Sequence, residues 1–190
     1  MTKSIKQEIG QLIIAGFRGT SINKESDIVK FINDYNLGGV ILYDEDLEIG
    51  GSGSRNISSP KQLKKLVAGL QSITEKSLLI AVDQEGGEVE RLRKIYGFSD
   101  TPSWNQIGLL NSKLMTKQFA EDMVEDLSSM GINLNFAPVI DLDYGVGTVI
   151  SDTKRAFSHD TEVLIEHTRI FSEVHRSKNI ITSGKHFPGL

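Results

Sequence analysis

The sequence predicts a parallel α/β fold, because short apolar runs alternate along the chain with amphipathic stretches of helical spacing. Right-handed crossovers between successive β-α units would build a parallel sheet with helices outside it. Two architectures compete, an open doubly wound sheet and a closed (β/α)8 barrel. No G-x-G-x-x-G motif follows the first predicted strand, so the dinucleotide-binding version loses support. Polar residues gather after the third, fourth and fifth strands, and a barrel collects such groups at one rim, which favours the barrel.

The chain opens with a predicted short helix, for which Ser4 and Gln7 fit a capping box. Residues 13–17 and 40–43 then read as the first two strands. Between them lies a predicted helix with apolar residues at i, i+3, i+4 and i+7, which are Ile28, Phe31, Ile32 and Tyr35.

Residues 44–59 are the least regular stretch and contain the glycine-rich run 50–54. A glycine-rich loop can bind phosphate, but no Lys-Ser/Thr follows this one, so a surface loop is predicted. Ser59 then caps a helix with Pro60 at its first position. The apolar face of this helix consists of Leu63, Leu66, Val67, Leu70 and Ile73.

The centre of the sequence is the stretch Leu78–Arg93, in which an apolar run ends abruptly in carboxylates. Residues 78–82 have no polar interruption and suit a strand buried on both faces. Asp83, Gln84 and Glu85 follow directly, and then comes Gly86-Gly87. Carboxylates at the carboxyl end of a buried parallel strand mark the place where α/β folds carry their chemistry. The glycine pair permits a turn that approaches a ligand closely.

A long helical segment is predicted from the turn at 101–103 to about Met130, with Gly131 as its C-cap. Its apolar stripe consists of Met115, Phe119, Met123, Leu127 and Met130. Residues 132–141 form a fourth predicted strand that ends near Asp141 and Asp143. Since Pro138 cannot donate a ladder hydrogen bond, a bulge or the end of the strand is expected there.

A loop of about 17 residues carries Arg155 and leads to a helix that begins near Asp160. Its predicted apolar face consists of Val163, His167, Ile170 and Val174. His167 is expected to be a packing residue and His175 a surface residue. A fifth strand at 180–182 leads into the polar segment that contains Lys185 and His186.

The composition restricts the classes of partner. The chain of 190 residues suits one domain, and its net charge of −4 argues against nucleic acid or an anionic membrane as partner. The absence of cysteine excludes disulfides and thiolate metal sites. The first residues contain no apolar signal region, and no apolar run approaches the roughly 20 residues of a membrane span. A cytoplasmic protein without a cofactor is expected.

Four motifs follow one another along the chain. They are Val82-Asp83-Gln84-Glu85-Gly86-Gly87-x-Val89-x-Arg91-Leu92, Asn135-Phe136-Ala137-Pro138-Val139-Ile140-Asp141, Arg155-x-Phe157-Ser158 and Gly184-Lys185-His186-Phe187-Pro188-Gly189. In content and order they resemble family 3 glycoside hydrolases, and the resemblance covers nearly the whole chain. The Pro-Gly after Lys-His-Phe is similar to the β-N-acetylhexosaminidase branch rather than the β-glucosidase branch.

This resemblance implies a TIM-type (β/α)8 barrel that removes terminal N-acetylhexosamine, for example from peptidoglycan fragments, with retention at the anomeric carbon. It implies that Asp83, Lys185 and His186 bind sugar hydroxyls and that Arg91 and Arg155 line the same site. A carboxylate can accept two hydroxyls, while Lys and Arg donate to sugar oxygens. No metal is implied.

The sequence departs from the family pattern where the chemistry would lie. From the residues alone, Asp83 and Glu85 are candidates for the two carboxylates of a retaining glycosidase. The family instead uses a histidine as acid/base, on a loop just after Lys-His-Phe-Pro-Gly, and an aspartate nucleophile further downstream. Neither occurs in this sequence, so no catalytic residue is assigned and the 190-residue chain is expected to be inactive.

The fold expected for residues 1–190 is therefore the N-terminal portion of the barrel, about its first five β/α units, with open edges at the first and fifth strands. Two other functions stay open at this point. One is a non-catalytic carbohydrate-binding or assembly protein. The other is a phosphate or metal site, for which the candidate oxygen ligands are Asp83, Glu85, Asp141 and Asp143.

Overall fold

The computed structural model describes residues 4–190, which contain five strands, seven α-helices and one short 3₁₀-helix. In chain order they are α1 (Ile5–Gly10), β1 (Ile14–Gly16), α2 (Asp27–Tyr35), β2 (Gly39–Leu42), α3 (Pro60–Gln71), β3 (Leu79–Val82), the 3₁₀-helix (Lys94–Tyr96), α4 (Trp104–Leu110), α5 (Lys113–Met130), β4 (Leu134–Asn135), α6 (Val149–Asp152), α7 (Thr161–Ser177) and β5 (Ile181–Thr182). Within residues 4–190, no helix combines the length and the apolar character needed to cross a membrane.

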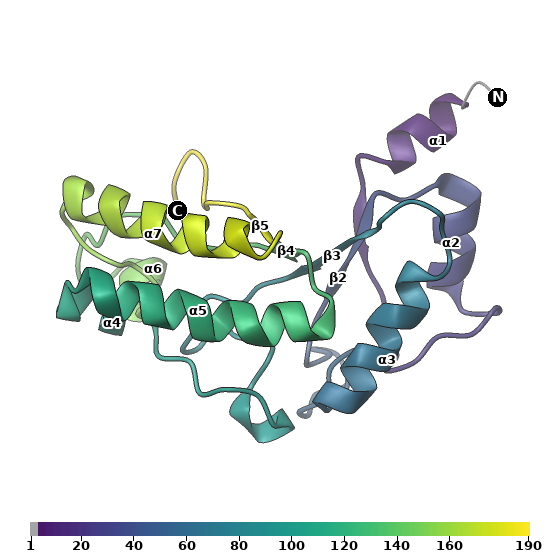
Figure 1. The fold of residues 1–190 in the computed structure, drawn as a ribbon, viewed down its shortest axis with the longest axis horizontal. Coiled ribbons are helices and arrows are strands. Elements are labelled where there is room, and N and C mark those ends of the chain that lie inside the picture. The colour runs from purple at the N-terminus through teal and green to yellow at the C-terminus, as the bar shows by residue number, and fades with distance from the viewer. Residues whose placement is uncertain (1–3) are drawn as a thin grey trace.

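The five strands form one parallel sheet in the order β1-β2-β3-β4-β5. Each new strand adds at the same edge, so the strand order never reverses as it does in a doubly wound sheet. Helix α5 packs between α3 and α7, and Figure 1 shows α5 and α7 side by side. This is the path of a partial (β/α)8 barrel, and the predicted fold class is confirmed.

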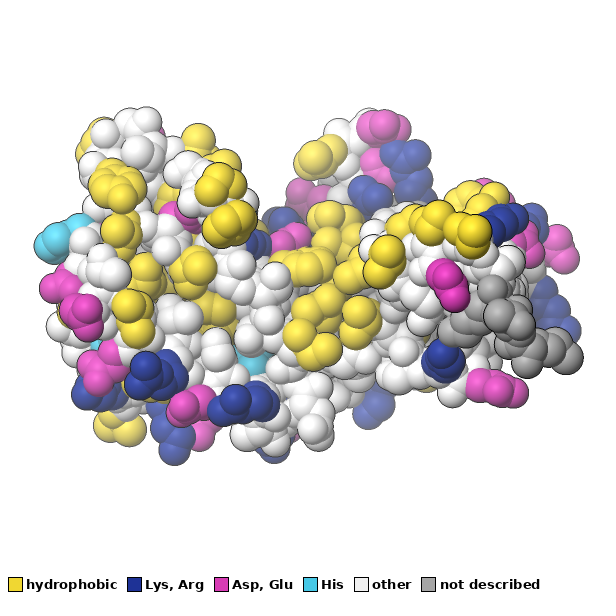
Figure 2. Space-filling view, turned by 90° about the horizontal axis from the view of Figure 1, so that it is seen from above, with side chains coloured by type: hydrophobic (Ala, Val, Ile, Leu, Met, Phe, Trp, Pro, Cys, Tyr) yellow, Lys and Arg dark blue, Asp and Glu magenta, His cyan; other side chains and the backbone are white. Residues whose placement is uncertain are grey.

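The two faces of the sheet differ in burial. Val40, Leu42, Ile80 and Val82 pack fully buried against the helices, in a core that includes apolar residues of α3 and α5. On the opposite face Ala81 is buried, but Ile181 is 54% exposed. The prediction that residues 78–82 form a strand buried on both faces is therefore confirmed for Ile80, Ala81 and Val82, whereas β5 is less buried. Seen from above in Figure 2, apolar side chains gather across the middle of the molecule.

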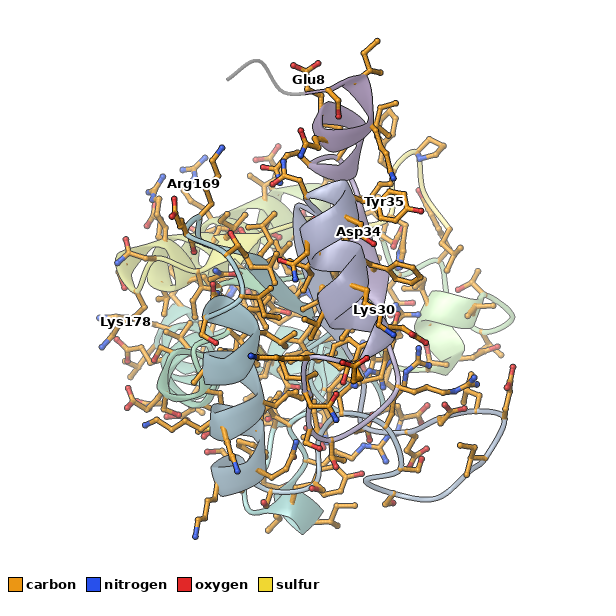
Figure 3. The ribbon with its side chains drawn as sticks, turned by 90° about the vertical axis from the view of Figure 1, so that its right-hand side faces the viewer. Glu8, Lys30, Asp34, Tyr35, Arg169 and Lys178 are labelled. Carbon is orange, nitrogen blue, oxygen red and sulfur yellow. The ribbon has the colours of Figure 1, made fainter. Side chains whose placement is uncertain are left out.

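Helix caps follow the predicted chemistry in the first half of the chain. Ser4 and Gln7 form a complete capping box, and the side chain of Ser59 accepts the Gln62 amide at the start of α3. Helix α2 forms in the predicted segment, but only two of its four predicted apolar residues are buried, Ile28 and Ile32. Figure 3 shows Lys30, Asp34 and Tyr35 on the outward side of this helix.

The predicted long helix before Met130 is two helices. Asn111 adopts a left-handed conformation with φ 42°, which ends α4, and the side chain of Ser112 then caps α5. Asn and Ser at these positions offer backbone alternatives to a continuous helix. The apolar stripe of α5 is otherwise as predicted, except that Met115 is exposed.

The buried face of α7 is rotated from the predicted one. It consists of Leu164, His167, Phe171 and His175. The expectation that His175 lies on the surface is wrong, because its ring is fully buried and stacks on Phe171 with centroids 4.0 Å apart. His167 is a packing residue as expected, and it contacts Thr116 and Asn111.

Strand pairing near Pro138 is interrupted and then resumes. Strand β4 ends at Asn135, which agrees with the expected end of the strand. Beyond the interruption the Lys185 amide donates to Pro138 O at 3.1 Å, and the Ile140 amide donates to Lys185 O at 2.7 Å. These bonds form a parallel bridge between Val139 and Lys185, and they fix Lys185 beside the segment that leads to Asp141.

Candidate functional site

All five residues predicted to bind substrate line one open hollow of about 390 Å³ at the carboxyl ends of the strands. Its lining consists of Asp83, Glu85, Val89, Arg91, Phe136, Arg155, Ser183, Lys185 and His186. A larger groove of about 790 Å³ lies between α5 and α7, but its charged side chains are spread over the outer surfaces of the two helices. The smaller hollow holds the convergent chemistry.

Lys185 connects the two carboxylates that follow β3. Its Nζ lies 2.7 Å from Asp83 Oδ1 and 2.5 Å from Glu85 Oε1. The two acids stand two residues apart, so both point to the same side of the extended backbone. Asp83 remains partly exposed to the hollow and has further acceptor capacity there.

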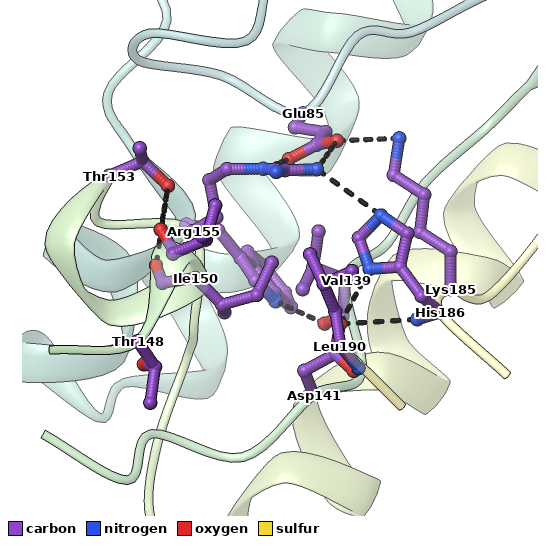
Figure 4. Close-up of polar contacts among 12 residues, drawn as sticks. Glu85, Val139, Asp141, Thr148, Ile150, Thr153, Arg155, Lys185, His186 and Leu190 are labelled. Atoms are coloured by element: carbon purple, nitrogen blue, oxygen red, sulfur yellow. Dashed lines mark hydrogen bonds and ion pairs between the residues drawn. The ribbon is translucent and has the colours of Figure 1, made fainter. Parts of the chain in front are cut away.

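Glu85 lies beneath the hollow as its main buried charge. Its side chain is 1% exposed and accepts two hydrogen bonds from Arg155, at 2.7 Å from Nε and 2.9 Å from Nη2 (Figure 4). This bidentate pair raises the pKa of Arg155, mainly through the hydrogen bonds to Glu85. Glu85 therefore serves as an anchor for Arg155 and Lys185, a role the sequence did not indicate.

His186 is oriented by Asp141 and Arg155. Its Nδ1 lies 2.6 Å from Asp141 Oδ2, and Arg155 Nη2 lies 3.3 Å from its Nε2 (Figure 4). Arg155 can only donate, so Nε2 accepts and Nδ1 carries the proton that binds Asp141. Asp141 also accepts the backbone amides of His186 and Leu190. The candidate metal ligand Asp141 is thus occupied in holding the ring.

Arg91 lies in the irregular segment that follows the glycine turn. Its guanidinium lies 3.7 Å from Asp44 and 5.7 Å from the centre of the Tyr43 ring. Its Nε is buried and has no hydrogen-bond partner among residues 4–190. Arg91 is therefore held by its surroundings while part of its donor capacity remains unused.

Gly86 and Gly87 form a turn that packs against other segments of the chain, and neither glycine lines the hollow. Both have positive φ, and the amides of Glu85 and Gly86 donate to Val89 O in a tight turn. A Cβ at Gly86 would lie 2.3 Å from Pro102 O. The space left by the missing side chain is filled by residues of the chain itself and not by a ligand.

The site presents hydrogen-bond donors and acceptors of both charges to one hollow, which suits a ligand with several hydroxyl groups. The positive charges of Lys185 and Arg155 neutralise Asp83 and Glu85, which would otherwise be candidate metal ligands. Residues 4–190 contain no group of three or more His, Cys, Asp or Glu arranged to hold a metal ion.

Comparison with known proteins shows which family and which relatives the chain is similar to. The model of the family described as glycosyl hydrolase family 3 N-terminal domain matches residues 4–190. A beta-hexosaminidase of Nitrosomonas eutropha is 33% identical over 177 residues, which cover 90% of this chain and 46% of that protein. A beta-hexosaminidase of Neisseria meningitidis is 34% identical, with 93% of this chain and 45% of that protein covered. The chain spans about half the length of these curated relatives.

Solved structures share the fold. A family 3 β-N-acetylglucosaminidase from Paenibacillus sp. superposes with a TM-score of 0.86 at 30% identity and covers 99% of this chain and 34% of that one. The structure of NagZ from Neisseria gonorrhoeae with N-trifluoroacetyl-D-glucosamine gives a TM-score of 0.79 at 29% identity, over 94% of this chain and 50% of that one.

Proposed function

Since the chain belongs to the glycosyl hydrolase family 3 N-terminal domain family, we propose that residues 1–190 supply the sugar-binding half of a retaining β-N-acetylhexosaminidase. The substrate we propose is a glycan with a terminal, non-reducing N-acetylhexosamine, as in peptidoglycan fragments. The observation that carries the proposal is the convergence of Asp83, Arg91, Arg155, Lys185 and His186 on one hollow.

The geometry supports specific roles for these side chains. Asp83 accepts from sugar hydroxyls with the oxygens that Lys185 leaves available. Lys185 and His186 present a donor and an imidazole edge on consecutive residues, and Arg155 contributes its guanidinium from the opposite side. Charge-assisted hydrogen bonds of this kind are stronger than neutral ones and orient the sugar ring.

The two carboxylates first considered for catalysis are engaged in the binding framework. Glu85 is bound to Arg155 and Lys185, and Asp83 is bound to Lys185. A buried carboxylate whose oxygens accept hydrogen bonds from two cations, as those of Glu85 do, has little lone-pair capacity left for nucleophilic attack. We therefore propose that the 190-residue chain binds sugar without turning it over.

Calorimetric titration of the chain with N-acetylglucosamine tests the binding. Saturable binding at millimolar sugar is expected. Lys185→Met should abolish it, because the variant lacks the ammonium group that binds Asp83 at the hollow. Lys178→Met changes an exposed lysine beyond the end of α7 and serves as the matched control. Absence of binding by the unsubstituted chain would contradict the proposal.

A chromogenic N-acetylglucosaminide separates binding from catalysis. The chain should release no chromophore above a buffer blank. Turnover that Lys185→Met removes would show that this chain holds a catalytic pair, and the proposed division between binding and chemistry would then be wrong.

A non-catalytic carbohydrate-binding or assembly role is the second candidate, and the occupied carboxylates favour it for the chain on its own. Both roles predict saturable binding in the titration with N-acetylglucosamine. They differ when the chain is mixed with a polypeptide that carries the C-terminal half of a family 3 barrel. Recovered turnover supports the enzyme, and binding without turnover supports the second role.

A further inference from the structure

Gln84 stands between the two acids of the site but points away from the hollow. Its side chain is buried, and its Oε1 accepts the amides of Arg91 at 2.8 Å and Leu92 at 3.0 Å. Its Nε2 lies 3.5 Å from Leu92 O. One side chain at the end of β3 therefore holds the backbone of the segment that carries Arg91.

Asn135 on β4 holds the main chain of Gln84 in turn. The Gln84 amide donates to Asn135 Oδ1 at 3.1 Å, and Asn135 Nδ2 donates to Gln84 O at 3.0 Å. This pair of bonds continues the ladder between two strands through a side chain. Asn135 is fully buried, so these bonds have no competition from water.

His175 on α7 completes the arrangement from the helix layer. Its Nδ1 lies 2.9 Å from Phe171 O, so this nitrogen carries the proton and donates it. Its Nε2 is then an acceptor, 3.3 Å from Asn135 Nδ2. Burial lowers the pKa of His175 to about 4, which keeps the ring in this neutral form near pH 7.

We infer that Gln84, Asn135 and His175 form a buried positioning relay that sets the place of Arg91 in the hollow. The three side chains connect α7 to the Arg91 backbone through consecutive hydrogen bonds, and each polar atom of the two amides has a partner. Asn135 has its orientation fixed at both ends, since its two neighbours require an acceptor on one side and a donor on the other.

The relay fixes the position of the Arg91 backbone whether or not a ligand binds. Its effect on sugar affinity rests on the proposed function of Arg91. Amide hydrogen exchange tests the relay without any ligand. In Gln84→Met the Arg91 and Leu92 amides lose their acceptor and should exchange faster by about tenfold or more. Gln84→Glu keeps an acceptor oxygen and should restore most of the protection.

Gln71→Met is the matched control, because Gln71 makes the same pair of bonds to the backbone of Leu78, at 3.0 and 2.9 Å. It should accelerate exchange at Leu78 and leave Arg91 unchanged. His175→Phe keeps the ring volume against Phe171, removes the acceptor for Asn135, and should accelerate exchange at Arg91 and Leu92. Rates within about twofold of the native chain in Gln84→Met or in His175→Phe, with a native circular dichroism spectrum, would overturn the relay.

A double-mutant cycle tests whether the relay acts on the ligand through Arg91. Gln84→Met should weaken N-acetylglucosamine binding roughly tenfold, and in the Arg91→Ala background it should cause no further loss beyond about twofold. Additive losses would mean that Gln84 acts elsewhere in the site. If the native chain binds no sugar, the proposed function fails, and the exchange rates alone decide the relay.

Discussion

Arg155 and Glu85 are 70 residues apart in the sequence and meet beneath the hollow through two hydrogen bonds from one guanidinium to one carboxylate. The pair joins the end of β3 to the loop before α7. Because Lys185 also contacts Glu85, one buried carboxylate ties three separate segments together. The candidate site is therefore built on an internal charge cluster as well as on the residues that line the hollow.

Removal of Arg155 should destabilise the fold. In Arg155→Met, Glu85 stays buried with Lys185 as its remaining charged partner, and leaving a buried charge poorly compensated costs about 3 kcal/mol. Urea denaturation should show this loss in the free energy of unfolding. Arg169→Met changes an exposed arginine of α7 and should leave the urea midpoint unchanged. Equal midpoints for the two variants would contradict the anchoring role of Glu85.

Asp83 and Glu85 should separate binding from stability. Asp83→Asn should weaken N-acetylglucosamine binding by about tenfold with little change in melting temperature, because Lys185 keeps Glu85 as partner. Glu85→Gln should lower the melting temperature, since the neutral amide cannot accept two charged donors equally well. Calorimetry and thermal melts on both variants make the comparison. A loss of stability in Asp83→Asn together with a loss of binding in Glu85→Gln would contradict this assignment of roles.

Gly86→Ala should be more destabilising than an alanine in an open glycine loop. Both Gly86 and Gly50 have positive φ, at 97° and 75°, but only Gly86 lies against another segment. Gly50→Ala should cost about 1 kcal/mol from the backbone conformation alone. Gly86→Ala adds the contact with Pro102 O and should exceed it clearly in urea denaturation. Similar losses would mean that the 86–87 turn moves freely.

Glu90 should make the fold less stable as the pH rises. Burial raises its pKa to about 7, and its Oε2 is buried without a hydrogen-bond partner among residues 4–190. The folded state therefore holds this proton more tightly than the unfolded state, and stability is lost between about pH 4.5 and 7.

Glu90→Gln removes this titration. Its melting temperature should exceed that of the native chain at pH 8 and match it at pH 4.5. The gain should be at most about 1 kcal/mol, because the partly exposed carboxyl is screened by water. Glu88→Gln, an exposed neighbour, is the control. An equal gain at both pH values would assign the effect to something other than the proton.

Titration of His175 should make the fold less stable as the pH falls, which is the opposite of the effect of Glu90. Burial lowers its pKa to about 4, so the unfolded chain binds a proton that the folded chain resists. The free energy of unfolding should fall as the pH drops from 6.5 to 4, by at most about 3 kcal/mol. Urea midpoints across this range should show a smaller slope for His175→Phe than for the native chain. His167, whose pKa burial also lowers, adds to this slope, and Glu90 acts against it above about pH 4.5.

An unchanged slope in His175→Phe would contradict this assignment. His159→Ala, which changes an exposed histidine outside the relay, is the matched control variant.

The sequence predicted the sheet because its signals are local. Apolar runs such as 78–82 and caps such as Ser59 act within a few residues, and the corresponding elements lie within two residues of their predicted bounds. The five candidate sugar-binding residues came from motifs, and the structure brings all five to one hollow.

Features that depend on distant partners were missed. His175 looks like a surface histidine at the end of a helix, but its ring stacks on Phe171 and lies within hydrogen-bond distance of Asn135, 40 residues earlier. Nothing in the sequence around Glu85 indicates that Arg155 binds it. The break at Asn111 follows from a left-handed backbone that a helical pattern of side chains does not reveal.

The sequential strand order also sets the order in which the hollow can form. Lys185 and Asp83 are separated by 102 residues, so their contact closes one of the long loops of the chain and belongs to its high contact order. Within residues 4–190, strand β5 has two residues and pairs with β4, and Lys185 and His186 follow it after two further residues. Detachment of β5 would have to break the bonds of Lys185 to Pro138, Asp83 and Glu85 as well as the strand pairing. The hollow is therefore complete only when the fifth strand is in place beside the fourth.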